Sequence, residues 1–283
     1  MRILVTGASG FTGRHFVPLA RTSGYDVHEL ASNLLDIGGL FEEVARCSPD
    51  FVVHLAAISF VQHAKSSDFF DVNVIGTQNL LESLLRLKQR PKRVLLASSS
   101  SVYGNAAISP VAETSPLNPV NAYGESKAKM EELAKVYLSE LEIITIRPFN
   151  YTGKGQSQNF LVPKIFSHFV RSENVIKLGN LDIRREFNDV RFVASAYLAL
   201  VEGTVSFREY NFCTGVTYAI SDIIELLVGL FGYAPSVEVD ESLKRDNEVA
   251  VLFGDESRLF GINKSLPRFD LGSTLAWMSE FKA

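Results

Sequence analysis

The chain has 283 residues, of which 46% are hydrophobic and 21% charged, and its formal net charge is -4. This length suits one large α/β domain or two small ones, and the composition allows a sizeable buried core. The charge gives no electrostatic basis for binding nucleic acid or an anionic membrane, and no apolar run is long enough to span a bilayer.

Short apolar runs alternate with helix-length segments through the first half of the chain. We expect strands at 2–6, 25–30, 51–56, 93–98 and 142–148, with helices between them, for example over 73–87 and 121–141. Strands that alternate with helices at this spacing predict a parallel sheet covered on both faces. Because crossovers in such sheets are right-handed, the predicted fold class is α/β with a doubly wound parallel sheet.

The alternation becomes less regular after Asn150. Segment 151–160 is polar and glycine-rich, and one more strand near 208–215 is expected to return to the sheet. We therefore expect residues 1–150, with about 188–212, to form the sheet domain. Residues 151–187 and 213–283 should form a smaller α/β lobe over the strand ends.

The start of the chain and its cysteines indicate the compartment. The first residues lead directly into a strand, which leaves no room for a signal peptide. The two cysteines, Cys47 and Cys213, show no ligand pattern. We expect reduced core thiols in a cytoplasmic protein, and no metal site.

Three glycines follow the first strand. Gly7, Gly10 and Gly13 form a G-x-x-G-x-x-G pattern that opens the first helix. Glycine lets the backbone approach a pyrophosphate closely, and a helix N-terminus offers free N–H groups and a positive dipole end. The position predicts a dinucleotide phosphate site, with a tight turn that binds nothing as the alternative.

The end of the second strand lacks the acid that usually binds the adenosine ribose. Ala31 and Ser32 stand about where that acid would be, and Glu29 comes too early unless the strand is short. Without a carboxylate there, Arg14, Ser32 and Asn33 are candidates to contact a 2′-phosphate. This favours NADP(H) and leaves NAD(H) possible. An ordinary solvated helix residue is the alternative for Arg14.

Tyr123 and Lys127 lie four residues apart on an expected helix. Side chains at i and i+4 share a face, so the ammonium can lie near the phenol. A tyrosine with its ordinary pKa of about 10 is a poor acid–base at neutral pH, and a nearby cation favours phenolate. The spacing gains weight from its place in the chain, after a glycine loop and a strand that ends in serines.

The motifs "TGASGFTG", "HLAA", "NVIGT", "ASSSSVYG", "YGESK" and "RPFN" together resemble the extended short-chain dehydrogenase/reductases that act on nucleotide sugars, in the NAD-dependent epimerase/dehydratase family. The resemblance spans nearly the whole chain. It implies a Rossmann domain that binds a nicotinamide cofactor and a C-terminal lobe that binds a nucleotide sugar. It implies Tyr123 as the acid–base, Lys127 on the nicotinamide ribose and Ser99 on the sugar oxygen. The candidate cofactor contacts are Gly7, Gly10, Phe11, Thr12, Gly13, Arg14, Ser32, Asn33, Leu55, Ala56, Ala57, Asn73, Tyr123, Lys127 and Pro148.

Two of these assignments concern the support of the active-site helix and the position of the nicotinamide. Asn73 matches a position that supports the active-site helix, and a plain helix cap is its alternative. Pro148 would lie against the nicotinamide. His54 is expected to be a buried, hydrogen-bonded strand residue and not a catalyst.

Four consecutive serines, 98–101, follow the fourth strand. Dehydratases of the family carry an acid in this motif, because removing water across two carbons needs an added acid and base. Ser100 and Ser101 hold those places here. The 3,5-epimerase/reductases have a Cys after the catalytic serine and a His downstream, and this chain has neither. Direct hydride exchange at a sugar carbonyl remains, which is the chemistry of a ketoreductase or a 4-epimerase.

Two later stretches, "LGNLDIRREFNDVRFVASAYLAL" and "LKRDNEVAVLFGDESRL", resemble the GDP-mannose 4,6-dehydratases and, better, their partner GDP-4-keto-6-deoxy-D-mannose reductases. Guanidinium groups suit a diphosphate and a carboxylate suits a ribose diol. The implied substrate contacts are Ser99, Ser100, Asn150, Asn180, Arg185, Arg245 and Glu248. Asp246 departs from the proline common in that branch, and a solvated charged face is the alternative for Arg184, Arg185 and Arg191.

We therefore expect NADPH-dependent reduction of GDP-4-dehydro-6-deoxy-D-mannose to GDP-D-rhamnose, or to GDP-6-deoxy-D-talose if hydride reaches the other face. The alternatives are a dTDP-4-keto-6-deoxyhexose reductase, a UDP- or dTDP-sugar 4-epimerase with bound NAD, and a non-catalytic NADP sensor. The resemblance also implies a homodimer that pairs the helices after Ile75 and Tyr123. A monomer's core accounts for the leucines of the first helix about as well.

Overall fold

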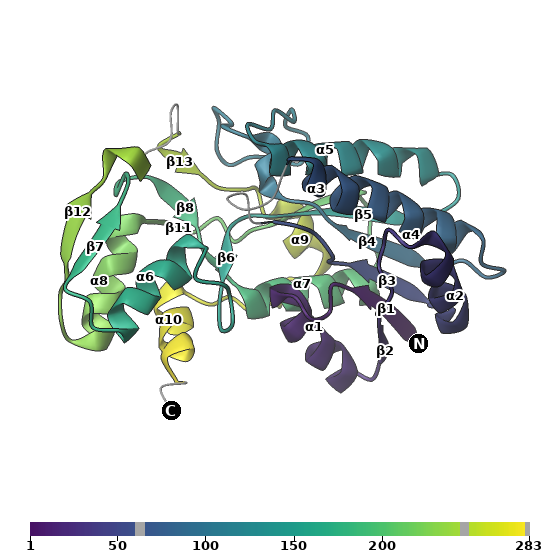
Figure 1. The fold of residues 1–283 in the computed structure, drawn as a ribbon, viewed down its shortest axis with the longest axis horizontal. Coiled ribbons are helices and arrows are strands. Elements are labelled where there is room, and N and C mark those ends of the chain that lie inside the picture. Colours follow the sequence, from purple (N-terminus) through teal and green to yellow (C-terminus); the bar gives the residue numbers. More distant parts are fainter. Residues whose placement is uncertain (60–65, 244–248, 281–283) are drawn as a thin grey trace.

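The larger part of the molecule is a six-stranded sheet in the order β10-β5-β4-β3-β1-β2 (Figure 1). The computed structural model describes residues 1–59, 66–243 and 249–280. The strands are β1 (Arg2–Thr6), β2 (Asp26–Glu29), β3 (Phe51–His54), β4 (Arg93–Ala97), β5 (Ile143–Pro148) and β10 (Glu209–Phe212). Each adjacent pair is parallel. The predicted doubly wound α/β fold is confirmed.

Helices cover both faces of this sheet (Figure 1). One face carries α1 (Phe11–Thr22), α7 (Val190–Glu202) and α9 (Ser257–Ile262), and the other carries α2 (Ile37–Cys47), α4 (Gly76–Leu85) and α5 (Ala122–Ala134). Their apolar residues recur three and four positions apart, as packing against a sheet requires. In α4, for example, Leu80, Leu81 and Leu84 are fully buried. These three leucines therefore belong to the core.

A smaller lobe lies at the carboxyl ends of the strands. Its elements are β6 (Tyr151–Thr152), α6 (Leu161–Val170), β7 (Val175–Leu178), β8 (Arg184–Glu186), β9 (Asn188–Asp189), β11 (Thr217–Ala219), α8 (Ile220–Phe231), β12 (Ser236–Val239), β13 (Val251–Leu252) and α10 (Leu271–Ser279). The strands form the sets β11-β8-β13, β12-β7 and β6-β9. A separate apolar core lies between α6, α8 and α10. The predicted smaller α/β lobe is present.

Part of the C-terminal region packs on the larger sheet. Leu259 of α9 and Leu266 are buried in the same core as Phe16 of α1. We keep the expected division into a dinucleotide domain and a sugar-nucleotide lobe as a proposal, with α9 on the sheet side of it.

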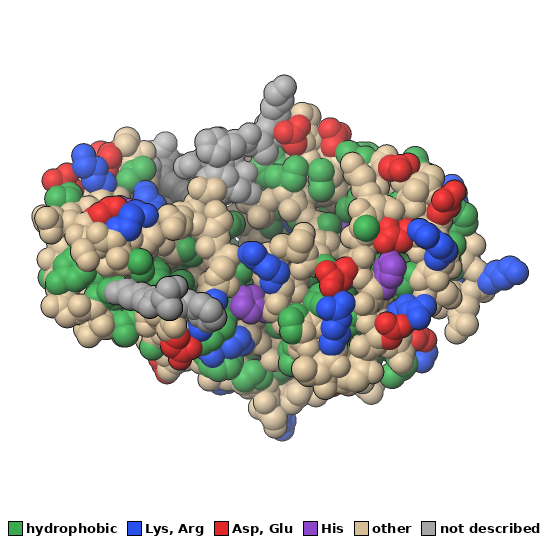
Figure 2. All heavy atoms as spheres, turned by 60° about the horizontal axis from the view of Figure 1, so that its bottom comes forward, with side chains coloured by type: hydrophobic (Ala, Val, Ile, Leu, Met, Phe, Trp, Pro, Cys, Tyr) green, Lys and Arg blue, Asp and Glu red, His purple; other side chains and the backbone are tan. Residues whose placement is uncertain are grey.

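Short helical segments complete the described chain: α3 (Ser66–Phe70), a π-helix (Asp71–Ile75) and 3₁₀ turns at Ser100–Tyr103, Lys135–Tyr137 and Glu241–Leu243. Among the helices described, none has the length and apolar character needed to cross a membrane. On the face turned forward in Figure 2, acidic and basic side chains are interspersed, and neither sign forms a continuous patch.

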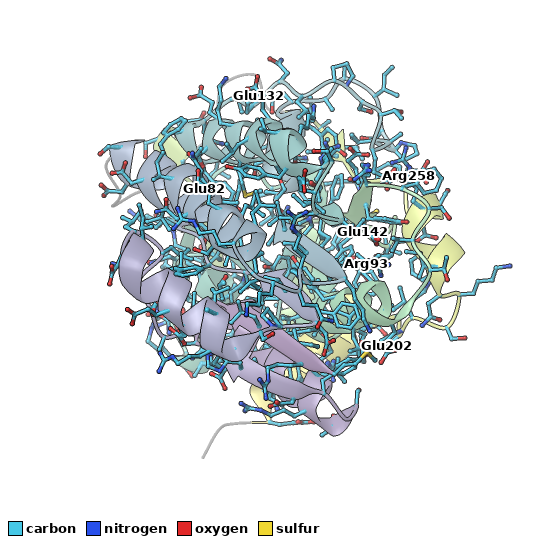
Figure 3. All side chains as sticks on the ribbon, turned by 90° about the vertical axis from the view of Figure 1, so that its right-hand side faces the viewer. Glu82, Arg93, Glu132, Glu142, Glu202 and Arg258 are labelled. Carbon is cyan, nitrogen blue, oxygen red and sulfur yellow. The ribbon has the colours of Figure 1, made fainter. Side chains whose placement is uncertain are left out.

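The two ends of the sheet differ in chemistry. At the amino ends of β4 and β5, Arg93 and Glu142 lie side by side and form an ion pair at 2.7 Å (Figure 3). Arg93 also donates to the carbonyl of Gly203 after α7 at 3.0 Å, so this end is closed by charged and polar links. The carboxyl ends face the lobe. The strand order reverses between β1 and β3, and ligands of such sheets bind at the carboxyl ends beside this point.

Candidate active site

The glycine loop connects β1 to α1 and is packed against the loop that follows β3. Gly7 has a φ of +66°, and a Cβ there would lie 2.6 Å from the backbone N of Ala56. A Cβ on Gly13 would lie 2.4 Å from the carbonyl oxygen of Ala8. Only glycine fits these two positions. Residues 7–13 and 55–57, both expected at the cofactor, therefore lie together at the switch point of the sheet.

The N-terminus of α1 offers free hydrogen-bond donors. Its N-cap is Gly10, which supplies no side-chain hydrogen bond. The first backbone N–H groups of the helix are thus without a cap, and the helix dipole adds partial positive charge there. This arrangement suits a pyrophosphate, so the chain fits the dinucleotide expected from the sequence.

Segment 151–156 is clasped onto the first turn of α1. Phe11 stacks on Tyr151 with ring centroids 5.7 Å apart, and the Thr12 hydroxyl lies 2.8 Å from the Tyr151 phenol oxygen. Arg14 donates to the carbonyl of Gly155 at 2.9 Å. The lobe segment that follows β5 is therefore fastened to the glycine loop.

Ser99, Tyr123 and Lys127 come together at the carboxyl end of β4. Ser99 follows this strand and accepts a hydrogen bond from the Ser101 N–H at 3.1 Å, which caps the 3₁₀ turn. The Tyr123 phenol lies near the Ser99 hydroxyl, which acts to lower the pKa of the phenol. One turn further along α5, the Lys127 ammonium donates to the carbonyl of Ala97 at 2.6 Å. The three residues expected to be catalytic thus form one cluster.

The pKa of Tyr123 is shifted in the direction opposite to the one we expected. Burial raises this pKa, the nearby phenol of Tyr151 raises it further, and the hydrogen bond from Ser99 opposes both. The Lys127 ammonium, which points to the β4 carbonyl, is not among the groups that shift it. The phenol is therefore protonated at neutral pH and stands ready as a proton donor.

Lys127 is a buried cation. Its side chain is 1% exposed, and burial lowers its pKa to about 8, with the negative charge of Glu131 acting in the opposite direction. Most of the Lys127 population is therefore charged at neutral pH, but the proton is held less firmly than on a surface lysine.

The four serines have separate tasks. Ser98 donates to the Glu131 carboxylate at 2.5 Å, whereas Ser99 reaches Tyr123. Ser100 and Ser101 begin the 3₁₀ turn. Glu131 is in turn held by Arg147, whose Nε and Nη2 donate to the two carboxylate oxygens at 3.0 and 2.6 Å. Sequence reasoning missed this buried pair, although Glu131 lies two turns after Tyr123 on the same helix face.

Asn73 is fully buried in the π-helix and acts as a connector. Its side-chain amide accepts from the N–H of Ile58 at 3.0 Å and donates to the carbonyl of Ile58 and to Ser126 of α5. Ser126 then donates to the carbonyl of Tyr123 at 2.8 Å. Asn73 therefore links the loop after β3 to α5.

The turn after β2 holds a carboxylate that comes from α2. Glu43 is 6% exposed and accepts from the N–H groups of Ala31 and Ser32 at 3.0 and 2.7 Å and from His28 at 2.8 Å. Burial acts to raise the pKa of Glu43, but these donors outweigh it and lower the pKa to about 2. Besides Glu29, the last residue of β2, a second carboxylate thus lies inside the turn that follows the strand. A signal was available, since Glu43 lies on the apolar stripe of α2 beside Val44.

The candidates for a 2′-phosphate are already engaged in local hydrogen bonds. Ser32 donates to the carbonyl of Gly39 at 3.1 Å, and the Asn33 amide oxygen accepts from the N–H of Leu35 at 2.9 Å. Arg14 is bonded to segment 151–156, as described above, and is exposed. Of these candidates, Arg14 is the one whose side chain carries a positive charge.

The residues expected at the nucleotide sugar lie on separate elements of the lobe. Asn150 is exposed directly after β5, and Pro148 is buried at the end of that strand. The Asn180 amide oxygen accepts from the N–H of Asp182 at 3.1 Å, and Arg185 of β8 donates to the carbonyl of Arg184 at 2.9 Å. Arg245 and Glu248 lie outside the residues that the structure describes.

Glu186 is a second carboxylate that sequence reasoning missed. It is 1% exposed and accepts from the N–H of Gly254 at 2.8 Å, the N–H of Thr214 at 2.9 Å and the Asn188 amide at 2.9 Å. Burial raises its pKa, and the N–H donors oppose that rise. Glu186 therefore connects β8 through hydrogen bonds to the loops that contain Thr214 and Gly254.

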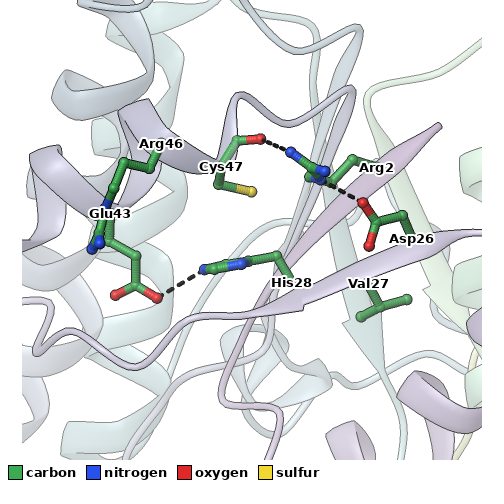
Figure 4. A pocket seen from close by; sticks show the side chains of 7 residues that line it. All are labelled: Arg2, Asp26, Val27, His28, Glu43, Arg46 and Cys47. Atoms are coloured by element: carbon green, nitrogen blue, oxygen red, sulfur yellow. Dashed lines mark hydrogen bonds and ion pairs between the residues drawn. The ribbon is translucent and has the colours of Figure 1, made fainter.

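A surface hollow of about 320 Å³ lies at the edge strand β2 and is separate from the cluster around Tyr123 (Figure 4). Its lining residues are Arg2, Asp26, Val27, His28, Glu43, Arg46 and Cys47. Arg2 donates to Asp26 at 2.7 Å and to the carbonyl of Cys47 at 2.8 Å. None of the residues expected at the active site lines it, and we assign it no catalytic role.

The sequence and fold match known proteins. Residues 3–213 match the NAD dependent epimerase/dehydratase family. The chain is 35% identical over 93% of its length to GDP-6-deoxy-D-talose 4-dehydrogenase from Aggregatibacter actinomycetemcomitans, covering 91% of that protein. It is 30% identical over 97% of its length to GDP-6-deoxy-D-mannose reductase from Pseudomonas aeruginosa, covering 94% of that protein. The solved structure of RMD from Pseudomonas aeruginosa complexed with NADPH superposes with a TM-score of 0.89 at 27% identity, covering 98% of this chain and 97% of that one.

Proposed function

Because the chain belongs to the NAD dependent epimerase/dehydratase family, we propose that it exchanges hydride at C4 of a GDP-linked 6-deoxyhexose. It is an NAD(P)-dependent oxidoreductase of nucleotide sugars, and the proposal concerns its substrate. The favoured reaction is reduction of GDP-4-dehydro-6-deoxy-D-mannose to GDP-D-rhamnose or GDP-6-deoxy-D-talose. The two relatives support it, because both are named for GDP-linked 6-deoxy sugars. D-Talose and D-mannose differ in configuration at C4, the atom that the proposed hydride would reach.

The observation that carries the proposal is the cluster formed by Ser99, the protonated Tyr123 beside it, and Lys127 one helical turn further along α5. When bound, a nicotinamide dinucleotide supplies or accepts the hydride. Tyr123 donates its proton to the carbonyl oxygen during reduction, and Ser99 orients that oxygen by a hydrogen bond. Lys127, whose ammonium donates to the carbonyl of Ala97 in this structure, would hold the nicotinamide ribose, as the family resemblance implies.

The neighbourhood of this cluster supports simple hydride exchange over water elimination. Ser100 and Ser101 stand where dehydratases of the family carry acids, and a hydroxyl without a partner base does not remove a carbon-bound proton. Among the described residues, the buried carboxylate nearest in sequence to Tyr123 and Lys127 is Glu131. Its oxygens already accept hydrogen bonds from Arg147 and Ser98. A ketoreductase needs no further acid or base.

For the substrate, we propose contacts with Ser99, Ser100, Asn150, Asn180 and Arg185. Arg245 and Glu248 are proposed from the resemblance alone. A guanidinium near the diphosphate would supply paired N–H donors. The GDP moiety is favoured over dTDP by the relatives' names.

For the cofactor, we propose NADP(H), with NAD(H) as the possible alternative. The neighbour complexed with NADPH supports this preference, and Arg14 is the cation available for a 2′-phosphate. The Glu43 carboxylate in the turn after β2 opposes it. We also propose a cytoplasmic homodimer that pairs α4 and α5, which carry the half-buried Glu82 and the exposed Glu132 respectively (Figure 3).

The test supplies purified protein with NADPH or NADH and a panel of 4-keto-6-deoxy sugars linked to GDP or dTDP. We expect loss of nicotinamide absorbance with the GDP-linked ketone, and NMR of the product identifies its C4 configuration. Turnover with the dTDP-linked ketone alone would move the assignment to that substrate class. Interconversion of UDP-glucose and UDP-galactose without added cofactor would overturn the proposal in favour of an epimerase.

A further inference from the structure

Helix α5 holds the end of β4 through three side chains that are spaced four residues apart. Each approaches a different residue at or just after the end of the strand: Tyr123 lies near the hydroxyl of Ser99, Lys127 donates to the carbonyl of Ala97, and Glu131 accepts from the hydroxyl of Ser98. Positions i, i+4 and i+8 lie on one helix face, so the three links form a single row. The proposed reaction accounts for the first two links and leaves the third without a role.

The third of these side chains, Glu131, is itself held in place by a buried ion pair. The Glu131 side chain is 4% exposed and lies in a two-pronged ion pair with Arg147 of β5, whose side chain is 6% exposed. Arg147 is fixed in turn by donating to the Tyr103 phenol and to the carbonyl of Glu113, each at 2.9 Å. A buried pair of this kind is not in itself a source of stability, because desolvation offsets its attraction. A role in holding the active site explains why it is there.

We propose that Glu131, clamped by Arg147, is a positioning residue of the active site, which fixes Ser98 and thereby the adjoining Ser99 and keeps a negative charge beside Lys127. The geometry leaves little freedom: the carboxylate is bonded on both oxygens, so Ser98 has one place to donate. Ser99 is the next residue in the chain, and a small displacement of a catalytic group costs a large factor in rate.

The electrostatic part of the proposal concerns the Lys127 ammonium. In the described part of the chain, the titratable groups that act on it or sense it are Glu131 on its own helix and His54 from β3. His54 is neutral, because burial, with the Lys127 charge adding, lowers its pKa to about 3. Glu131 is therefore the negative charge that favours a protonated Lys127. Its removal should let Lys127 lose its proton at lower pH.

Two variants separate charge from position. Glu131→Gln keeps an oxygen that can accept from Ser98 but removes the charge, whereas Ser98→Ala keeps the ion pair but removes the link to the strand. Glu132→Gln is the matched control, since Glu132 is the next residue on α5, is exposed and pairs with Lys129. The double variant Glu131→Gln/Arg147→Met also removes the guanidinium that Glu131→Gln would leave without a counter-charge, and it is used if Glu131→Gln alone does not fold.

The first measurement is the pH dependence of NADPH binding, which needs no sugar substrate. Binding is monitored through the quenching of protein fluorescence. We expect the alkaline loss of binding to move to lower pH in Glu131→Gln, and in the double variant, while Ser98→Ala and Glu132→Gln keep the wild-type profile. The second is turnover: Ser98→Ala should lower kcat by on the order of tenfold or more with KM little changed.

The inference rests on the proposed function only in the turnover measurement. If the wild type reduces no GDP-linked ketone while the binding profile still shifts in Glu131→Gln, the function fails and the charge role of Glu131 stands. If Glu131→Gln and Glu132→Gln lose NADPH binding at the same alkaline pH, that role is refuted. A Ser98→Ala variant with wild-type kcat refutes the positioning role.

Discussion

Acid should destabilise this fold through His54, which joins the ends of β1 and β3 to α4. Thr77 donates its hydroxyl to the carbonyl of Asn73 at 2.8 Å, so its oxygen accepts from Nε2–H of His54 at 2.8 Å. The Nδ1 atom then accepts from the Thr6 hydroxyl at 2.7 Å, and the Thr6 oxygen accepts from the Ala56 N–H at 3.1 Å. Both ring nitrogens of the neutral His54 therefore have a hydrogen-bond partner. An added proton on Nδ1 would point at the Thr6 hydroxyl, which already donates its own hydrogen to this nitrogen.

The magnitude follows from the shift in pKa. Burial, with the Lys127 charge adding, lowers the pKa of His54 from 6.5 to about 3. In the unfolded chain the ring keeps its ordinary pKa, so below pH 6.5 the unfolded state binds more protons and the free energy of unfolding falls. Each pKa unit corresponds to about 1.4 kcal/mol, so at about pH 5 the loss from this group is about 2 kcal/mol.

The variant His54→Gln removes the titration while keeping one donor and one acceptor. Urea unfolding of wild type and variant at about pH 7.5 and about pH 5 gives the loss in each protein, and the wild type should lose about 2 kcal/mol more. His168→Gln, in the lobe, shows how far any histidine substitution changes that difference. Equal losses in wild type and His54→Gln would refute the reasoning.

Three further predictions concern other groups of the site. Tyr123→Phe should lower kcat by a factor on the order of 10²–10⁴ and leave the Kd for NADPH unchanged, and a parallel loss of binding would contradict the acid role. Glu43→Gln removes a charge that repels a 2′-phosphate, so the ratio of Kd values for NADPH and NADH should fall, which fluorescence titration measures; equal changes for both would count against it. Glu186→Gln places an NH₂ group against N–H donors and should lower the free energy of unfolding by about 1–3 kcal/mol, measured with urea, whereas a wild-type value would show that the loops adjust.

The fold could be predicted because it depends on local patterns. The apolar strands, the glycines after β1 and the four-residue spacing of Tyr123 and Lys127 each follow from short-range geometry, and the six-stranded sheet has the expected strands. Leu259 shows the limit: α9 looked like part of the lobe, but it packs on the sheet. Which surface a short amphipathic helix covers is decided by tertiary contacts, which the period of its apolar residues does not identify.

The electrostatics of the site could not be predicted, because they depend on residues distant in sequence. The sequence indicated no acid directly after β2, but the strand is short and ends at Glu29, and Glu43 reaches the same turn from α2 and accepts hydrogen bonds from its backbone. The sequence spacing placed Lys127 near Tyr123, but the ammonium points to the carbonyl of Ala97. Proximity on a helix face does not fix where a flexible side chain finds its partner.

The directions of the two pKa shifts bear on which way the enzyme runs. Burial raises the pKa of Tyr123 and lowers that of Lys127 to about 8, so at neutral pH the cluster holds a protonated phenol beside a cation. Reduction of a ketone consumes a proton, and this is the protonation state that reduction requires. Oxidation of the alcohol would need Tyr123 in its phenolate form, and burial disfavours that charged form. Because reduction is the direction we propose, the protonated phenol is the form that Tyr123 needs at the start of each turnover, and Tyr123 must regain its proton between turnovers.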